Sequence, residues 1–124
     1  MAFERFVETG RRTYTPKGTL TRFGMLGFNH AARQKFEIDK YGYCILLYDR
    51  ASRRIGVLLT KDSKEDGAKK IRLRKTGADV PARAFVRHFG IDNSDTTICP
   101  ISRDDETGYL VIDLNQGKKR ARRA

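Results

Sequence analysis

The alternation of apolar and polar positions predicts a chain made mainly of short β-strands. Four runs in the first half have strand character, at residues 19–22, 25–28, 43–48 and 55–59. Gly24 separates the first two runs, and the polar residues 49–54 predict a hairpin loop between the last two. Asn29 is a favourable N-cap, so we expect a helix of about two turns from His30 to Phe36.

The second half shows the same order of elements after a polar linker at residues 60–69. Residues 70–74 alternate strictly between basic and apolar side chains, which predicts a strand with one basic and one apolar face. Gly77 predicts a turn, Pro81 the first turn of a helix, and Gly90 the end of that helix. Strands are expected at 96–101 and 109–114, around a loop at 102–108.

The two halves also align as an internal repeat with an offset of 53 residues. Eight of the forty pairs between residues 20–59 and 73–112 are identical, where chance gives about two to three. The repeat predicts two copies of one unit, residues 18–60 and 70–114, that interlock into a mainly β, pseudo-two-fold barrel with short helices. The shared core is expected around Leu20, Phe36, Ile45, Leu73, Phe89 and Ile98, with Phe36 and Phe89 as buried equivalents. Residues 1–114 then form a single domain, and residues 3–14 could add a strand or a turn.

Charge adds the first indication of function. The net charge is +11, and the last ten residues contribute +5 without any acid, which leaves +6 on the rest. A basic body with a basic tail is typical of a nucleic-acid-binding protein, although solubility alone could explain the charge of the body. The tail, residues 115–124, is too polar to pack and is expected to be disordered until it contacts phosphates.

Catalytic and metal-binding patterns are missing from the sequence. His30 and His88 fall on the predicted helices without a catalytic motif around them, so we expect no enzyme and no cofactor. Cys44 and Cys99 lie in apolar runs and fit no zinc-binding spacing, so we expect buried free thiols. No apolar run is long enough for a membrane helix and the first residues do not form a signal peptide, so the expected location is the cytoplasm.

A motif begins in the first predicted turn and ends after the first predicted helix. Arg22–Asn29 stands where one family has Ser-Lys-Gly-Gln-Ile-Thr-Ile-Pro, Ala32–Arg33 where it has a helical Ile/Val-Arg pair, and Phe36–Ile38 where it has Leu-Gly-Ile. On these residues the chain resembles the AbrB/SpoVT superfamily of swapped-hairpin regulators, which includes MazE-type antitoxins and the duplicated MraZ proteins. The resemblance implies a swapped-hairpin or related cradle-loop barrel that binds DNA and regulates transcription.

The second half is a looser match. Thr76–Gly77 and Phe89–Ile91 fit the pattern, whereas Pro81 lies one position early and Val86 stands where the helix arginine belongs. The Lys-Gly-Gln signature is out of register, because its counterpart at Lys17–Thr21 lies six residues too early. In relatives with one unit per chain the barrel needs two chains. Here one chain could close it alone, and a homo-oligomer stays open.

The resemblance places the nucleic-acid face on the first hairpin and the helix start of each unit. The matching basic positions are Arg22, Arg33, Arg72, Arg74, Lys75 and Arg83. The alternating strand adds Lys70, and the tail adds Lys118, Lys119, Arg120, Arg122 and Arg123. For the strand alone, charge that protects an exposed edge from aggregation explains the pattern equally well.

Three functions compete for this chain. The leading prediction is a DNA-binding regulator, and the first alternative is an RNA- or ribosome-associated protein. Exposed aromatic residues on the basic face would favour RNA, and the candidates are Tyr14, Phe23, Tyr41 and Tyr43. The second alternative is an antitoxin or scaffold that binds protein, for which residues 3–7 offer the one apolar segment.

Overall fold

The protein folds into a nearly closed antiparallel β-barrel with two short helices, which confirms the predicted fold class. The computed structural model describes residue 3 and residues 15–119. The predicted N-terminal strand or turn therefore lies outside the described residues, apart from the exposed Phe3. The elements are β1 (Lys17–Leu20), β2 (Met25–Phe28), α1 (His30–Lys35), the 3-10 turn η1 (Ile38–Lys40), β3 (Tyr43–Asp49), β4 (Arg54–Thr60), β5 (Lys69–Lys70), β6 (Arg72–Leu73), β7 (Ala78–Pro81), α2 (Arg83–Phe89), β8 (Thr97–Arg103), β9 (Leu110–Asp113), η2 (Leu114–Gln116) and β10 (Lys118–Lys119).

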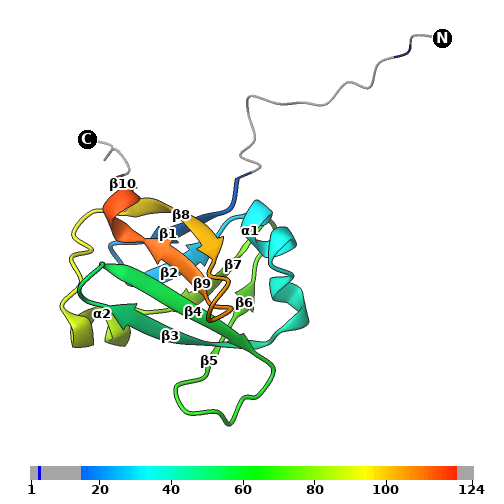
Figure 1. Ribbon diagram of the computed structural model, residues 1–124, viewed down its shortest axis with the longest axis horizontal. Coiled ribbons are helices and arrows are strands. Elements are labelled where there is room, and N and C mark those ends of the chain that lie inside the picture. Colours follow the sequence, from blue (N-terminus) through cyan, green and yellow to red (C-terminus); the bar gives the residue numbers. More distant parts are fainter. Residues whose placement is uncertain (1–2, 4–14, 120–124) are drawn as a thin grey trace.

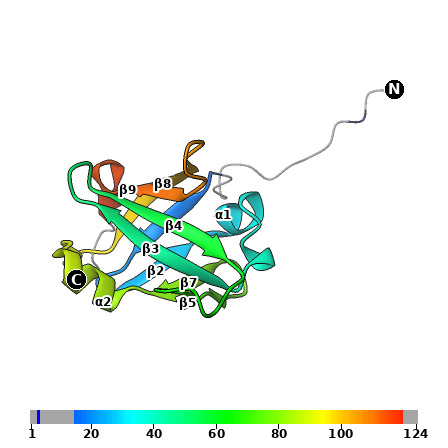
Figure 2. The same cartoon turned by 60° about the horizontal axis from the view of Figure 1, so that its bottom comes forward.

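One path of hydrogen-bonded neighbours runs around the barrel in the order β5-β3-β4-β9-β8-β1-β2-β7-β6, and β10 pairs with β8 beside it. The two ends of this path, β5 and β6, are separated in the chain by Ile71 alone, so the chain itself bridges the remaining gap. The Ile71 amide donates to the carbonyl oxygen of Gly42 (2.9 Å), and its side chain is buried. The helices lie at opposite ends of the barrel (Figures 1 and 2).

The break at Ile71 corrects the continuous strand predicted over residues 70–74. Lys70 belongs to β5 and pairs with Tyr43, whereas β6 pairs with β7. Leu73 was expected in the core, but its side chain is 50% exposed. It lies opposite the buried Ala78 on a strand that has no hydrogen-bonded neighbour on its other side in the described sheet, so the barrel covers it on one side only.

The repeat is visible in the pairing of the strands. β2 and β7 occupy positions 53 residues apart and pair with each other, as do parts of β4 and β9. Val57 lies opposite Leu110, its counterpart 53 residues later, so an approximate two-fold axis passes between them. Neither repeat closes a barrel without the other, and both contribute to one hydrophobic core.

The ungapped alignment fails at one strand of each unit. Cys44 pairs with Leu59 in the first hairpin, and Ile101 pairs with Ile112 in the second. Since Ile112 is the counterpart of Leu59 at the offset of 53, Ile101 is the counterpart of Cys44 at an offset of 57. The second unit therefore has four more residues before β8 and four fewer in the hairpin. Sequence identity had aligned Ile45 with Ile98, and both are half-buried rather than core residues.

At the end of each helix, a phenylalanine ring is contacted by an arginine from the other repeat. The guanidinium group of Arg103, in the second repeat, lies over the ring of Phe36 in the first (5.5 Å). Arg50, in the first repeat, lies over the ring of Phe89 in the second (5.2 Å). Both pairs combine an arginine and a phenylalanine that are identical at the offset of 53, although the register of β8 makes Arg103 the structural counterpart of Leu46 rather than of Arg50. The predicted equivalence of burial is wrong, because Phe36 is 3% exposed whereas Phe89 is only partly buried.

Local signals explain where the helices begin and end. The Asn29 side-chain oxygen accepts from the amides of Ala32 (2.9 Å) and Lys17 (3.0 Å), which confirms the predicted N-cap and ties α1 to β1. Gly90 has φ +62° and ends α2, as predicted. Pro81 is not in the first turn of α2, because it pairs with Met25 as the last residue of β7.

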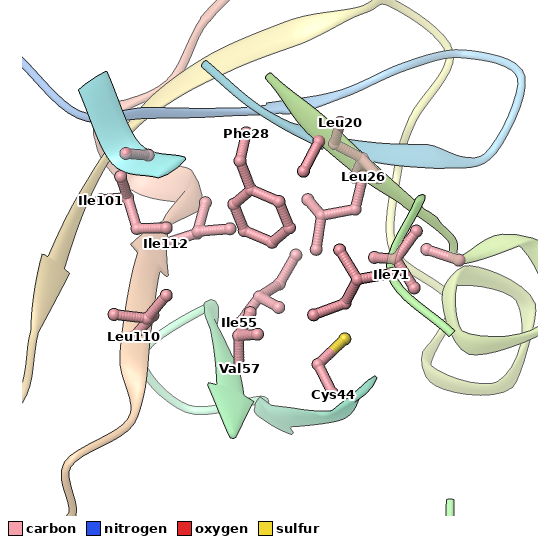
Figure 3. Close-up of a cluster of buried hydrophobic side chains, with 14 of the residues drawn as sticks. Leu20, Leu26, Phe28, Cys44, Ile55, Val57, Ile71, Ile101, Leu110 and Ile112 are labelled. Atoms are coloured by element: carbon pink, nitrogen blue, oxygen red, sulfur yellow. The ribbon is translucent and has the colours of Figure 1, made fainter. Parts of the chain in front are cut away.

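The barrel interior is filled by apolar side chains from both repeats, mostly aliphatic with Phe28 and Cys44 among them (Figure 3). The described cysteines, Cys44 and Cys99, are free and buried, as predicted. Burial raises the pKa of the Cys44 thiol to about 12 and that of Cys99 to about 11.

The first half of the predicted disordered tail is folded. Residues 114–116 form η2, with the Asp113 carboxylate accepting from the Asn115 amide (2.9 Å), and β10 then pairs with β8. The strand places Lys118 opposite Ile98 and Lys119 opposite Thr97. At Thr97 and Ile98, β1 pairs with one edge of β8, and the other edge is open to the residues after η2. The composition of the tail could not predict this pairing.

Candidate nucleic-acid interface

The β1–β2 turn and the start of α2 hold each other in place. The Gly24 amide donates to the Thr21 carbonyl oxygen (3.0 Å), and the Gly24 carbonyl oxygen accepts from the Ala82 amide (2.8 Å). Gly24 has φ +84°, and a Cβ at this position would lie 2.9 Å from Cβ of Arg83. Only glycine allows this close approach without strain, so the turn packs directly against the start of the helix.

A pocket of about 350 Å³ lies where this turn meets α2 and the loop before β8. We call it the basic corner; it is lined by Arg22, Phe23, Gly24, Arg83, Val86, Arg87 and Asn93. Among the described residues, those that line it include three arginines and no acid. The described lining of the basic corner therefore concentrates three positive charges and holds no negative one.

Helix geometry and local contacts position several side chains of the basic corner. Arg83 and Arg87 are four residues apart on α2, which places both exposed side chains on one face of the helix. The Asn93 side-chain amide donates to the Thr21 carbonyl oxygen (3.2 Å) and anchors the loop to the turn. Phe23 is 72% exposed, and the guanidinium group of Arg22 lies 4.9 Å from the centre of its ring.

The predicted arginines Arg72, in β6, and Arg74, directly after β6, share one carboxylate. Arg72 Nε donates to Asp79 Oδ1 (2.9 Å) and Arg74 Nε to Asp79 Oδ2 (2.7 Å). The structure thus brings these two predicted site residues together, but Asp79 cancels one of their two charges. Arg72 also reaches the Met25 sulfur (3.7 Å), and Met25 adjoins Gly24 of the basic corner.

The guanidinium group of Arg33 is bound within the protein and stabilises the fold. Its guanidinium group makes a bidentate ion pair with Asp39 (2.6 and 2.9 Å) and donates to the carbonyl oxygens of Arg74 (2.6 Å) and Gly77 (3.1 Å). The hydrogen bond from Arg33 holds the pKa of the Asp39 carboxyl below its usual value. These contacts tie α1 to η1 and to the β6–β7 turn, and they use most of the donors that the resemblance assigned to nucleic acid.

The remaining predicted site residues are spread over the surface. Lys70 and Lys75 are exposed in β5 and in the β6–β7 turn. Lys118 and Lys119 are exposed in β10, and Lys119 Nζ lies 3.6 Å from Asp95. Arg120, Arg122 and Arg123 lie outside the described residues.

Arg87 and Asn93 were missed as site residues by the sequence. The spacing of Arg83 and Arg87 on a predicted helix was the available signal for the first, whereas the position of Asn93 depends on the longer loop before β8. The sequence indicates Phe23 only as a candidate for stacking. Of the other candidates, Tyr41 and Tyr43 are half-buried, and Tyr14 lies outside the described residues.

A second, larger hollow has the opposite character. An open groove of about 900 Å³ runs between the β3–β4 and β8–β9 hairpins. Its lining includes five acids against two arginines: Asp49, Asp104, Asp105, Glu106, Asp113, Arg54 and Arg103. Acidic side chains are thus gathered at this groove, whereas none lines the basic corner in the described part of the chain.

Comparisons with known proteins give no assignment: no family model, curated protein or solved structure matches this chain. In residues 15–119 no three His, Cys, Asp or Glu side chains come together as a metal-binding group. No helix in the described part of the chain has the length and apolar character to cross a membrane.

Proposed function

We propose that the protein binds nucleic acid, with the basic corner as the principal contact to the phosphate backbone. The observation that carries this proposal is the pocket lined by Arg22, Arg83 and Arg87 without an acid among its described lining residues. The strand arginines differ, because Arg72 and Arg74 both pair with Asp79. Guanidinium groups match the bidentate geometry and the charge of phosphate oxygens.

The whole-molecule charge supports a polyanionic partner. The chain carries +11, yet five of its fifteen acids line one groove. This separation orients an approaching polyanion toward the basic corner and away from the groove. Lys118, Lys119 and the arginines after them would add contacts that do not depend on sequence.

The resemblance to the AbrB/SpoVT superfamily supports a more specific form of this proposal, a DNA-binding transcription regulator. Arg22 and Arg83 are among the residues that the resemblance assigns to the nucleic-acid face, and both line the basic corner. The barrel of interlocked repeats agrees with the architecture that the resemblance implies.

Fluorescence anisotropy with labelled 20-residue duplex DNA, single-stranded DNA and hairpin RNA tests the proposal. We expect the R83Q/R87Q variant to bind more weakly than wild type at low salt. A K61Q/K64Q variant removes the same charge from the exposed loop between β4 and β5 and should bind as wild type does. Absence of binding by wild type to all three polymers, or equal weakening by the two variants, would refute the role of the basic corner.

A further inference from the structure

We propose that the basic corner accepts an unpaired nucleobase, which stacks on the ring of Phe23. This inference rests on the proposed function and narrows its ligand to nucleic acid with at least one unpaired base. It concerns chemistry that single-stranded DNA and RNA share.

The exposure of Phe23 is the first observation. The ring is 72% exposed at the tip of a turn, where a polar residue would serve the turn equally well. The hydrogen bonds at Gly24 and the close approach to Arg83 hold the backbone beside it. The ring is therefore presented to solvent from a fixed position rather than from a loose loop.

The surroundings of the ring are the second observation. Phe23 lines the basic corner together with Arg22, Arg83 and Arg87, so phosphate-binding groups surround an apolar platform. Aromatic side chains with adjacent cations are the usual means of holding unpaired bases, because every base has a face that can stack. The volume of about 350 Å³ lies within the range of pockets that take small organic groups.

Arg22 fixes the geometry of the platform. Its guanidinium group lies 4.9 Å from the centre of the Phe23 ring, within the distance of a cation–π contact. The Arg22 amide donates to the Thr96 hydroxyl (3.2 Å), which ties this residue to the start of β8. Arg83 and Arg87, four residues apart on α2, line the same pocket and would contact phosphates next to the stacked base.

A duplex cannot use this platform, because its bases are already stacked and paired. The proposal therefore predicts that Phe23 contributes to binding of single strands and of unpaired loops, and contributes little to binding of a perfect duplex. Selectivity for single strands would come from this one ring, whereas the arginines act on all polymers.

The test compares Phe23→Leu, which keeps an apolar side chain without an aromatic face, with the conservative Phe23→Tyr. The probes are a 12-residue single-stranded DNA, the RNA of the same sequence, the duplex, and the single strand with one abasic residue at each position in turn. We expect Phe23→Leu to weaken binding to both intact single strands by roughly 5- to 150-fold, to leave duplex binding unchanged, and to abolish the penalty of the most sensitive abasic site. Phe23→Tyr, which keeps the aromatic face, should bind the single strands with wild-type affinity. Thermal melts should confirm that the variants fold, since the side chain is exposed.

A strand in which 2-aminopurine replaces the base at the most sensitive site gives a second readout. We expect wild type to quench its fluorescence on binding and Phe23→Leu to leave it bright. If single strands bind in an Arg83- and Arg87-dependent manner while Phe23→Leu matches wild type, the stacking proposal fails and the proposed function stands. If wild type binds none of the probes, the proposed function itself fails.

Discussion

Truncation of the two aromatic residues at the helix ends tests the packing of the interlocked barrel. Phe36 is 3% exposed, so Phe36→Ala removes a whole ring from the core and should lower the free energy of unfolding by about 3–5 kcal/mol. Phe89 is only partly buried, although its ring lies 5.1 Å from that of Phe85 and 5.3 Å from that of Tyr48. Because part of its apolar surface already lies in water in the folded state, Phe89→Ala should cost less, about 1.5–3 kcal/mol.

Urea denaturation followed by far-ultraviolet circular dichroism and by tyrosine fluorescence measures both effects. Since the repeats share one core, we expect the two probes to give coincident transitions in each variant. The corresponding leucine variants are the controls, because they keep most of the apolar volume and should each cost less than the alanine variant. Equal losses of stability for Phe36→Ala and Phe89→Ala, or a larger loss at Phe89, would refute the derivation of these values from burial.

Three further predictions concern charges and thiols. Asp79→Asn removes the carboxylate shared by two arginines and should tighten nucleic-acid binding at low salt in anisotropy titrations, while costing at most about 2 kcal/mol of stability by urea denaturation; weaker binding would contradict this. Cys44 and Cys99 are buried with raised pKa values, so a thiol reagent at pH 8 should modify them at the rate of unfolding; rapid modification of the native protein, followed by absorbance, would contradict their burial. The pKa of Asp39 is lower in the folded state, so its ion pair with Arg33 stabilises the fold above the usual carboxyl pKa, and this stability is lost as the pH falls through the folded pKa. Asp39→Asn should therefore make the urea midpoint less sensitive to acid below about pH 4. An unchanged pH profile would argue against the ion pair.

The sequence predicted the elements well where local chemistry determines them. Strand Met25–Phe28, the Asn29 cap and the Gly90 terminator lie where the pattern placed them, because alternation, side-chain capping and left-handed backbone are local properties. Leu73 and the register of β8 were predicted wrongly for a different reason. Strand edges and pairing offsets depend on contacts between the repeats. The second unit has four more residues before β8 and four fewer in its hairpin, and a shift by an even number of residues does not change the alternation of apolar and polar positions.

The candidate site was predictable in part. The resemblance to the AbrB/SpoVT superfamily pointed to Arg22 and Arg83, and both line the basic corner. The sequence could not show that Arg33 is engaged by Asp39 and two carbonyl oxygens, since these partners meet only when the barrel closes. In the same way, the position of Arg87 and Asn93 beside the first turn follows from the interlocking of the repeats.

The salt dependence of binding tests the central claim most directly. The measurement is the slope of the logarithm of the association constant against the logarithm of salt concentration, for wild type, R22Q/R83Q/R87Q, and the matched control K35Q/K61Q/K64Q. Removal of one arginine–phosphate ion pair should make the slope less steep by about 0.9 on duplex DNA or about 0.7 on a single strand. We predict a change equivalent to up to three such ion pairs for the basic-corner variant and none for the control, whose lysines are exposed on α1 and on the loop after β4. Equal slopes for the two variants would contradict a phosphate-binding role for the basic corner.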